Sequence, residues 1–170
     1  MNPMKNIKIG KAVLNIGVGH GGRELSEAEN VLEELANQEP VRTFAKQTNQ
    51  TWGVREGSPV GCKVTVRKQP AVDLLKKLLE VRGNEIKESS FDDSGNFSFG
   101  IDEHIEIPKM EYDPDVGIFG LDVSVDLVRP GFRVAKRRRE PKKIPSSHRI
   151  DKEEAIEFVE ENLEVRVVNA

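Results

Sequence analysis

The sequence has one cysteine, Cys62, three histidines and few aromatic residues, which make up 5% of its 170 residues. A single cysteine excludes an internal disulfide and a multi-cysteine zinc site, so we expect Cys62 to be a small buried residue. No apolar run approaches the ~20 residues that a membrane-spanning helix needs. The first residues also contain no apolar stretch typical of a signal peptide. The sequence therefore predicts a cytoplasmic protein, with one compact domain over residues 1–170.

Basic residues are concentrated in three segments, although the net charge of the chain is −3. Residues 1–23 carry a net charge of +4, residues 42–68 of +5 and residues 133–150 of +7. Residues 85–126, in contrast, contain twelve acidic residues and two lysines. An acidic chain argues against nucleic acid, but phosphates respond to the local field, so clustered bases can still bind RNA. We expect the acidic segment to face solvent or basic neighbouring proteins instead.

Hydrophobic periodicity predicts alternating strands and helices. Strands are expected at residues 7–17, 41–46, 62–67, 96–101, 121–128 and 165–168. Helices are expected at residues 25–38, 70–81 and 151–163, with Ser26 or a neighbour capping the first and Asp151 capping the last. Pro130, Gly131, Pro141 and Pro145 favour an extended basic loop, without a helix, over residues 129–149. This order predicts an α+β fold with a mainly antiparallel sheet, helices on one face, a long basic loop and a C-terminal helix.

A glycine-rich turn at residues 17–22 has the spacing of a dinucleotide-binding loop. The next expected strand ends in Lys46 rather than an acidic residue, and it is followed by another strand instead of a helix. We therefore favour a structural turn that needs positive φ, or a loop that lets the backbone approach an RNA phosphate. A nicotinamide-dependent enzyme remains the main alternative.

Two other short patterns suggest metal chemistry but are incomplete. The residues from His104 to Glu106 have the H-x-E spacing of zinc deaminases, but the paired cysteines that complete that site are absent. Residues 92–96 resemble part of a calcium loop, without the alternating ligands or the closing glutamate. We therefore expect no catalytic residue, no metal site and no cofactor.

Two segments have the composition of RNA-binding surfaces. Residues 42–68 interleave basic side chains with amides and with Trp52, which is either a core anchor or a ring exposed for base stacking. Residues 133–149 hold eight basic residues and two prolines, a composition that cannot bury itself. A protein–protein module that uses the acidic surface is a further alternative.

Several stretches also match one known family in order and spacing. They are Asn15–Gly19, Glu39–Thr43, Val54–Arg67, Ser90–Gly100, Tyr112–Pro114, Gly117–Asp122, Arg129–Phe132 and His148–Arg149. The chain resembles large-subunit ribosomal protein five, the universal family that docks 5S rRNA, in its archaeal form. The resemblance implies a structural, non-enzymatic constituent of the ribosomal central protuberance. The implied partners are 5S rRNA, large-subunit rRNA, P-site tRNA and neighbouring ribosomal proteins.

The resemblance also assigns candidate residues to each RNA. It places 5S rRNA contacts at Asn15, Gln38 and Thr65, and the nearby basic residues Lys11, Lys63 and Arg67 join them as candidates. The tRNA-facing loop maps to residues 47–57, with the candidates Gln47, Thr48, Asn49, Gln50, Thr51, Trp52 and Arg55. The candidates for rRNA contact in the basic loop are Arg133, Lys136, Arg137, Arg138, Arg139, Lys142, Lys143 and Arg149.

Overall fold

The computed structural model describes residues 2–108, 110 and 117–168. Within them the strands are β1 (Lys8–Gly17), β2 (Val41–Phe44), β3 (Pro59–Val66), β4 (Glu85–Lys87), β5 (Phe97–Ile101), β6 (Leu121–Val128) and β7 (Arg166–Val168). The α-helices are α1 (Arg23–Ala36), α2 (Gln69–Val81), α3 (Arg133–Lys136) and α4 (Lys152–Leu163). Short 3-10 turns occupy Pro3–Lys5, Glu88–Ser90, His104–Glu106 and Ser146–His148.

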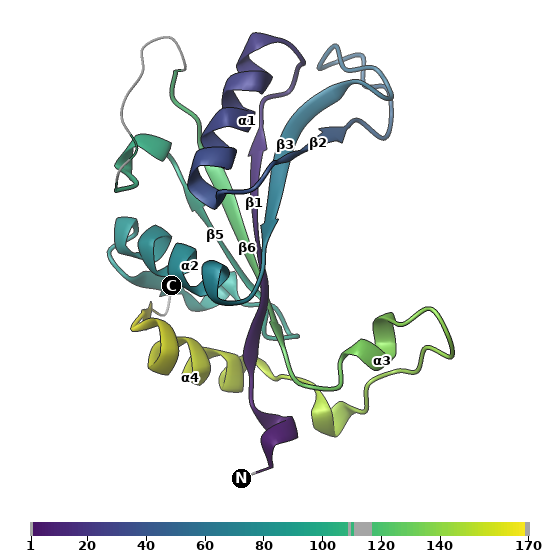
Figure 1. The fold of residues 1–170 in the computed structure, drawn as a ribbon, viewed down its shortest axis with the longest axis vertical. Coiled ribbons are helices and arrows are strands. Elements are labelled where there is room, and N and C mark those ends of the chain that lie inside the picture. Colours follow the sequence, from purple (N-terminus) through teal and green to yellow (C-terminus); the bar gives the residue numbers. More distant parts are fainter. Residues whose placement is uncertain (1, 109, 111–116, 169–170) are drawn as a thin grey trace.

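Five strands form one antiparallel sheet in the order β2-β3-β1-β6-β5 (Figure 1). The remaining strands, β4 and β7, form a small parallel pair beside the helices. The N-terminal strand β1 is central, because it pairs with β3 on one side and with β6 on the other. The predicted α+β fold with a mainly antiparallel sheet is confirmed.

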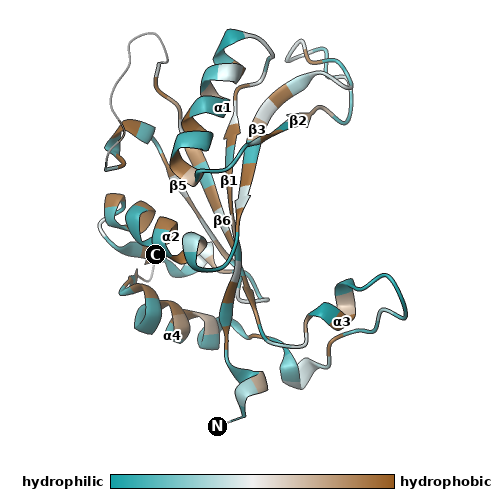
Figure 2. Cartoon of the chain, in the orientation of Figure 1, coloured by the Kyte–Doolittle hydropathy of each residue, from teal (hydrophilic) through white to brown (hydrophobic). Residues whose placement is uncertain are grey.

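The hydrophobic core lies between one face of the sheet and the helices. Successive strand residues point to opposite faces, so alternate residues such as Leu14 on β1 and Val123 on β6 are fully buried. Leu32 of α1 and Leu75 of α2 close the core from the other side. Brown stripes on these strands mark the apolar alternation in Figure 2. Each such side chain contributes about 1.5–3 kcal/mol through burial, which fixes the helices on this face.

Several boundaries differ from the sequence-based expectations. Strand β3 begins at Pro59, not at residue 62, because its first residues still pair with β2. Helix α1 begins after Gly22, and Ser26 lies inside its first turn, so the expected cap at Ser26 is wrong. The helix ends at Ala36 because Asn37 adopts the left-handed conformation at φ 49°.

Two features at the C-terminal end test the capping and loop predictions. Asp151 caps α4 as expected, in a capping box with Glu154. The expectation that residues 129–149 contain no helix is wrong, because Arg133–Lys136 form the single turn α3. That turn fits between Gly131 and Pro141, where no proline interrupts the backbone. No helix among the described residues is long and apolar enough to cross a membrane.

Candidate RNA interface

The face of the sheet opposite to the helices is open and polar. Along β1, Ala12 and Leu14 are buried, whereas Lys11, Val13 and Asn15, which alternate with them, reach the other face. On β3 the same alternation leaves Lys63 exposed. We call this surface the open face of the sheet.

Strand pairing places three of the predicted 5S rRNA residues together on the open face. Asn15 lies directly opposite Lys63, and Val13 lies directly opposite Thr65. Lys63 is exposed, while Asn15 and Thr65 are half-buried. Arg67 follows the last residue of β3 and is also exposed. The geometry thus brings amide, hydroxyl and cationic groups onto neighbouring strands.

Gln38 is not part of this group. It lies in the connection between α1 and β2, where it lines a shallow depression with Glu33, Glu34 and Glu39. Carboxylates repel phosphate, so this position is less favourable for an RNA backbone than the open face.

Arg42 is bound within the chain and turned away from the open face. It pairs with Cys62 of β3, on the helix-covered side of the sheet. Its Nε donates to Glu29 Oε1 at 2.6 Å and its terminal nitrogen donates to Oε2 at 2.9 Å. These hydrogen bonds lower the pKa of Glu29. Arg42 therefore ties β2 to α1.

Two acidic residues of β6, which belong to the acidic segment 85–126, lie on the open face. Asp122 lies opposite Asn15, and Asp126 lies opposite Lys11. Asp126 is 3.7 Å from the Lys11 ammonium and 3.5 Å from that of Lys136. Because one carboxylate faces two ammonium groups, this cluster keeps a net positive charge.

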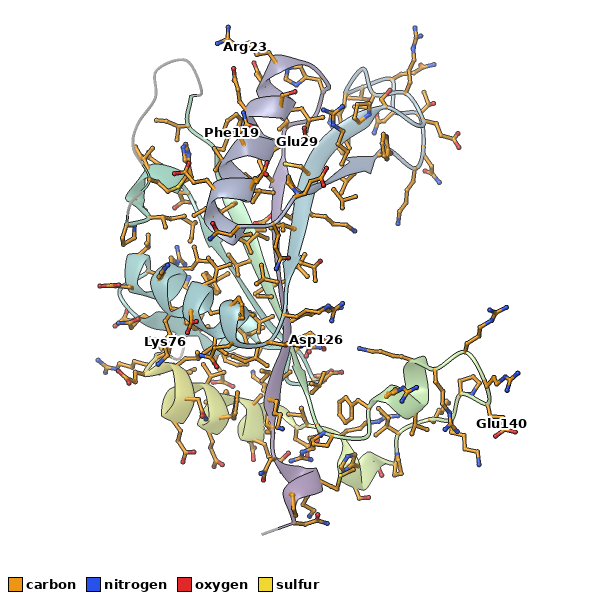
Figure 3. All side chains as sticks on the ribbon, viewed as in Figure 1. Arg23, Glu29, Lys76, Phe119, Asp126 and Glu140 are labelled. Atoms are coloured by element: carbon orange, nitrogen blue, oxygen red, sulfur yellow. The ribbon has the colours of Figure 1, made fainter. Side chains whose placement is uncertain are left out.

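Residues 133–150, here called the basic arm, lie on the side of the sheet opposite to the helices (Figure 1). Figure 3 shows Glu140 near the far end of the arm, away from Asp126 on the sheet. All eight predicted rRNA-contacting residues of the arm are exposed. The ion pair between Lys136 and Asp126 connects the arm to the open face. The structure thereby brings the third basic segment next to the first.

A buried arginine, Arg129, anchors the base of the arm, and sequence reasoning did not identify it. Its side chain is 6% exposed and donates to the carbonyls of Lys5 and Arg149 and to a carboxylate oxygen of Glu154, at 2.9, 2.7 and 2.8 Å. The base is also closed by His148, whose Nε2 lies 2.8 Å from the Pro130 carbonyl oxygen. The only sequence signal for Arg129 was its position at the start of a family-matched stretch.

The loop between β2 and β3 is folded back on itself at the end of the sheet. Asn49 and Val54 exchange backbone hydrogen bonds, and Thr48 Oγ1 accepts from the Glu56 N–H at 3.0 Å. Trp52 lies between them with 78% of its surface exposed, so the core-anchor interpretation of Trp52 is wrong. The loop presents the other tRNA-facing candidates mostly to solvent.

The glycine-rich turn does not form a dinucleotide-binding loop. The Val18 and Gly19 N–H groups both donate to the Val60 carbonyl, at 3.0 and 2.8 Å, so neither is free to bind a phosphate. The strand before the turn pairs only with antiparallel neighbours, whereas a dinucleotide-binding fold needs a parallel sheet. Gly19 and Gly22 have φ of 91° and 131°, as a structural turn requires.

The remaining sequence patterns have structural roles. His104 is buried, and its Nδ1 accepts a hydrogen bond from the Phe119 N–H at 3.1 Å. Asp92 accepts from the backbone of Ser94 and Asn96, which closes a tight turn. Cys62 is fully buried, as predicted. No cluster of three metal-ligating side chains occurs within residues 2–108, 110 and 117–168.

An open polar sheet face joined to an exposed basic arm is typical of proteins that bind structured RNA. Comparison with known proteins makes the class specific. Residues 2–55 match the family described as ribosomal protein L5, and residues 59–158 match the C-terminus of the same ribosomal family.

Archaeal proteins named large ribosomal subunit protein uL5 align along nearly the whole chain. The protein from Sulfurisphaera tokodaii is 51% identical over 169 residues, which is 99% of this chain and 96% of the relative. Those from Methanobrevibacter smithii and Methanosphaera stadtmanae are 48% and 49% identical, over 99% and 98% of this chain. Both alignments cover 99% of the relative.

The chain therefore belongs to the ribosomal protein L5 family. It is a structural, non-enzymatic constituent of the large ribosomal subunit, and its place is the ribosome in the cytoplasm. Its partners are accordingly ribosomal RNA and other ribosomal proteins.

Proposed function

We propose that the open face binds 5S rRNA and helps to attach it in the central protuberance. The observation that carries this proposal is the adjacency of Asn15, Lys63 and Thr65 across β1 and β3. Among the described residues, neither Lys63 nor the neighbouring Arg67 has an acidic partner, so both cations are available to phosphates. Amide and hydroxyl groups beside them suit ribose hydroxyls and base edges, which distinguish RNA from other polyanions.

The basic arm extends this surface toward large-subunit rRNA. Its exposed side chains reach away from the sheet, while Arg129 holds its base. Phosphate contacts add affinity roughly in proportion to their number, so an arm with eight basic residues supplies a second, mainly electrostatic contact. The loop at residues 47–57 lies at the end of the sheet, away from the arm (Figure 1). This separation leaves the loop free to contact P-site tRNA.

The helices form the opposite side of the molecule, and the two acidic ones, α1 and α4, face other proteins. On α4, Glu153, Glu157, Glu160 and Glu161 are exposed. Such a surface repels RNA and attracts the basic ribosomal proteins that surround it. Protein partners that remain bound after RNase treatment would support this side as a protein interface.

The open-face proposal is tested by measuring 5S rRNA binding against salt. Replacing Lys63 and Arg67 together with Ala should weaken binding and make the dependence of log affinity on log salt less steep by roughly 1.4–1.8, since each lost phosphate contact removes about 0.7–0.9. Lys76→Ala together with Lys77→Ala is the matched control, because both lysines are exposed on α2, on the helix-covered side of the sheet. Figure 3 labels Lys76 on this side. An equal loss of 5S rRNA affinity in the two double variants would contradict an open-face site.

A further inference from the structure

A pocket of about 630 Å³ lies between the β2–β3 loop and the glycine-rich turn. Val18 and Val60 line it as apolar walls, and the indole of Trp52 lines it from the loop. Gly17 and Gly19 complete its rim, and a Cβ atom added to either glycine would meet no atom within 4 Å. The glycines therefore leave unfilled space beside an aromatic ring.

The polar groups at the edge of this pocket have free hydrogen-bonding capacity. Gln47 has no side-chain hydrogen bond within the described part of the chain. Asn49 Oδ1 accepts from the Thr51 N–H at 3.0 Å, which leaves the amide NH₂ free to donate. Thr48 Oγ1 accepts from a backbone N–H and keeps its own proton to donate. These amide and hydroxyl groups match the donors and acceptors of a nucleobase edge.

The charges around the pocket favour an anionic strand. Lys46 and Arg55 flank the loop, both are exposed, and neither has an ion pair among the residues that the structure describes. An apolar peptide would gain nothing from these cations, whereas an RNA strand pairs its phosphates with them.

We propose that this pocket binds one unpaired nucleobase of an RNA strand, stacked on the Trp52 indole, with its edge toward Gln47, Thr48 and Asn49. Stacking on an exposed aromatic ring tolerates any base, and the side-chain amides add a preference. The proposal rests on the proposed function for one point, that the loop at residues 47–57 contacts RNA. It is independent of the 5S rRNA proposal, because the pocket lies apart from the open face.

Trp52 is the only tryptophan in the chain, so intrinsic fluorescence reports on this site directly. The full chain is titrated with a hexamer of adenylate and, separately, with inorganic polyphosphate, which carries phosphates without bases. The hexamer should quench the fluorescence saturably, and polyphosphate should not. Absence of quenching by the hexamer, or equal quenching by polyphosphate, would overturn the proposal. Quenching by an apolar peptide alone would also overturn it.

Variants measured with fluorophore-labelled hexamers of each of the four nucleotides separate stacking from recognition of the base edge. Trp52→Ala should weaken binding about tenfold, Trp52→Phe should retain most of it, and Gln47→Ala should change the preference among the four bases. Trp52 is 78% exposed, so its loss leaves the core intact. If the three variants and the native chain all bind the hexamer with equal affinity, the proposal is overturned.

The same variants distinguish this proposal from the 5S rRNA proposal. Trp52→Ala should leave 5S rRNA affinity unchanged, whereas Lys63→Ala with Arg67→Ala should lower it. If Lys63→Ala with Arg67→Ala lowers 5S rRNA affinity while Trp52→Ala binds the hexamer normally, only the base-pocket proposal fails. If that double variant binds 5S rRNA normally while Trp52→Ala no longer binds the hexamer, only the open-face proposal fails.

Discussion

Burial decides what each polar residue of this chain contributes. Lys63 and Trp52 are exposed and have their functional groups available to a ligand. Arg129 is buried, and its guanidinium is fully engaged by the chain itself. A cationic side chain is therefore a candidate RNA contact only where it is exposed and has no partner within the described chain, as Lys63 is.

Cys62 provides a residue-scale prediction about pH. Burial raises the pKa of its thiol to about 11, from an ordinary value of 9.0. Because the pKa of this thiol is higher in the folded than in the unfolded chain, burial of the neutral thiol contributes fully to the free energy of unfolding below pH 9. This contribution is lost as the pH rises to about 11. The free energy of unfolding should fall over this window by up to about 2 kcal/mol.

Denaturant unfolding at pH 8, 9, 10 and 11 measures this effect, with Cys62→Ala as the reference. Every other ionisable group is common to the two proteins, so the difference between the two curves isolates the thiol. Parallel curves for the two proteins would show that Cys62 is not buried as the structure describes.

At the scale of elements, the basic arm is a loop with a fixed base and an exposed end. Arg129 and His148 close the base, and Lys136 attaches the arm to the sheet through Asp126. Arg138 and Arg139 lie further out and are exposed, without an ion pair in the described part of the chain. The residues that hold the arm and those that meet solvent are therefore different.

Replacing Arg137, Arg138 and Arg139 with Ala should weaken rRNA binding and make its salt dependence less steep by roughly 2–3, because up to three phosphate contacts are lost. Thermal stability should change little, since exposed substitutions generally alter the free energy of unfolding by less than about 0.5 kcal/mol. Filter binding between 50 and 300 mM salt, together with a thermal melt, provides both values. An unchanged salt dependence would exclude the arm from the RNA interface.

Elements with strong periodicity were predicted well, whereas two short elements, β4 and α3, were missed. The alternating apolar residues of β6 predicted Leu121–Val128, which are its observed bounds. The three-residue strand β4 carries no periodic signal and exists because β7 pairs with it. Helix α3 was missed because neighbouring prolines masked a single proline-free turn.

The candidate site was only partly predictable from the residues. Clustered charge identified the segments, and the family resemblance identified Asn15 and Thr65. The pairing of Asp126 with both Lys11 and Lys136 depends on the register between β1 and β6, which come from opposite ends of the chain. Local sequence patterns do not specify such a register, so the expectation that the acidic segment faces solvent or basic neighbouring proteins did not include these contacts.

At the scale of the whole molecule, the sheet separates two chemically different sides. Helices α1, α2 and α4 cover one face, and the basic arm lies beside the other (Figure 1). The acidic helix surfaces therefore cannot screen the open face directly. The proposed RNA site on the open face is therefore compatible with a net charge of −3, because the local field on that side is set by its own basic residues.

The topology also predicts that the two family-matched segments unfold together. Strand β1, from residues 2–55, has both of its neighbours, β3 and β6, in residues 59–158. Neither segment can complete the sheet alone, and the buried side chains form one cluster that includes residues of both. We therefore expect residues 1–170 to behave as one domain with a single cooperative unfolding transition. Far-UV circular dichroism and pulsed thiol labelling of Cys62 should give the same denaturant midpoint, because β3, which carries the buried thiol, lies between β2 and β1 of the shared sheet. Labelling of Cys62 well below the circular-dichroism midpoint would mean that β3 separates from the sheet first, and the chain would then consist of two units.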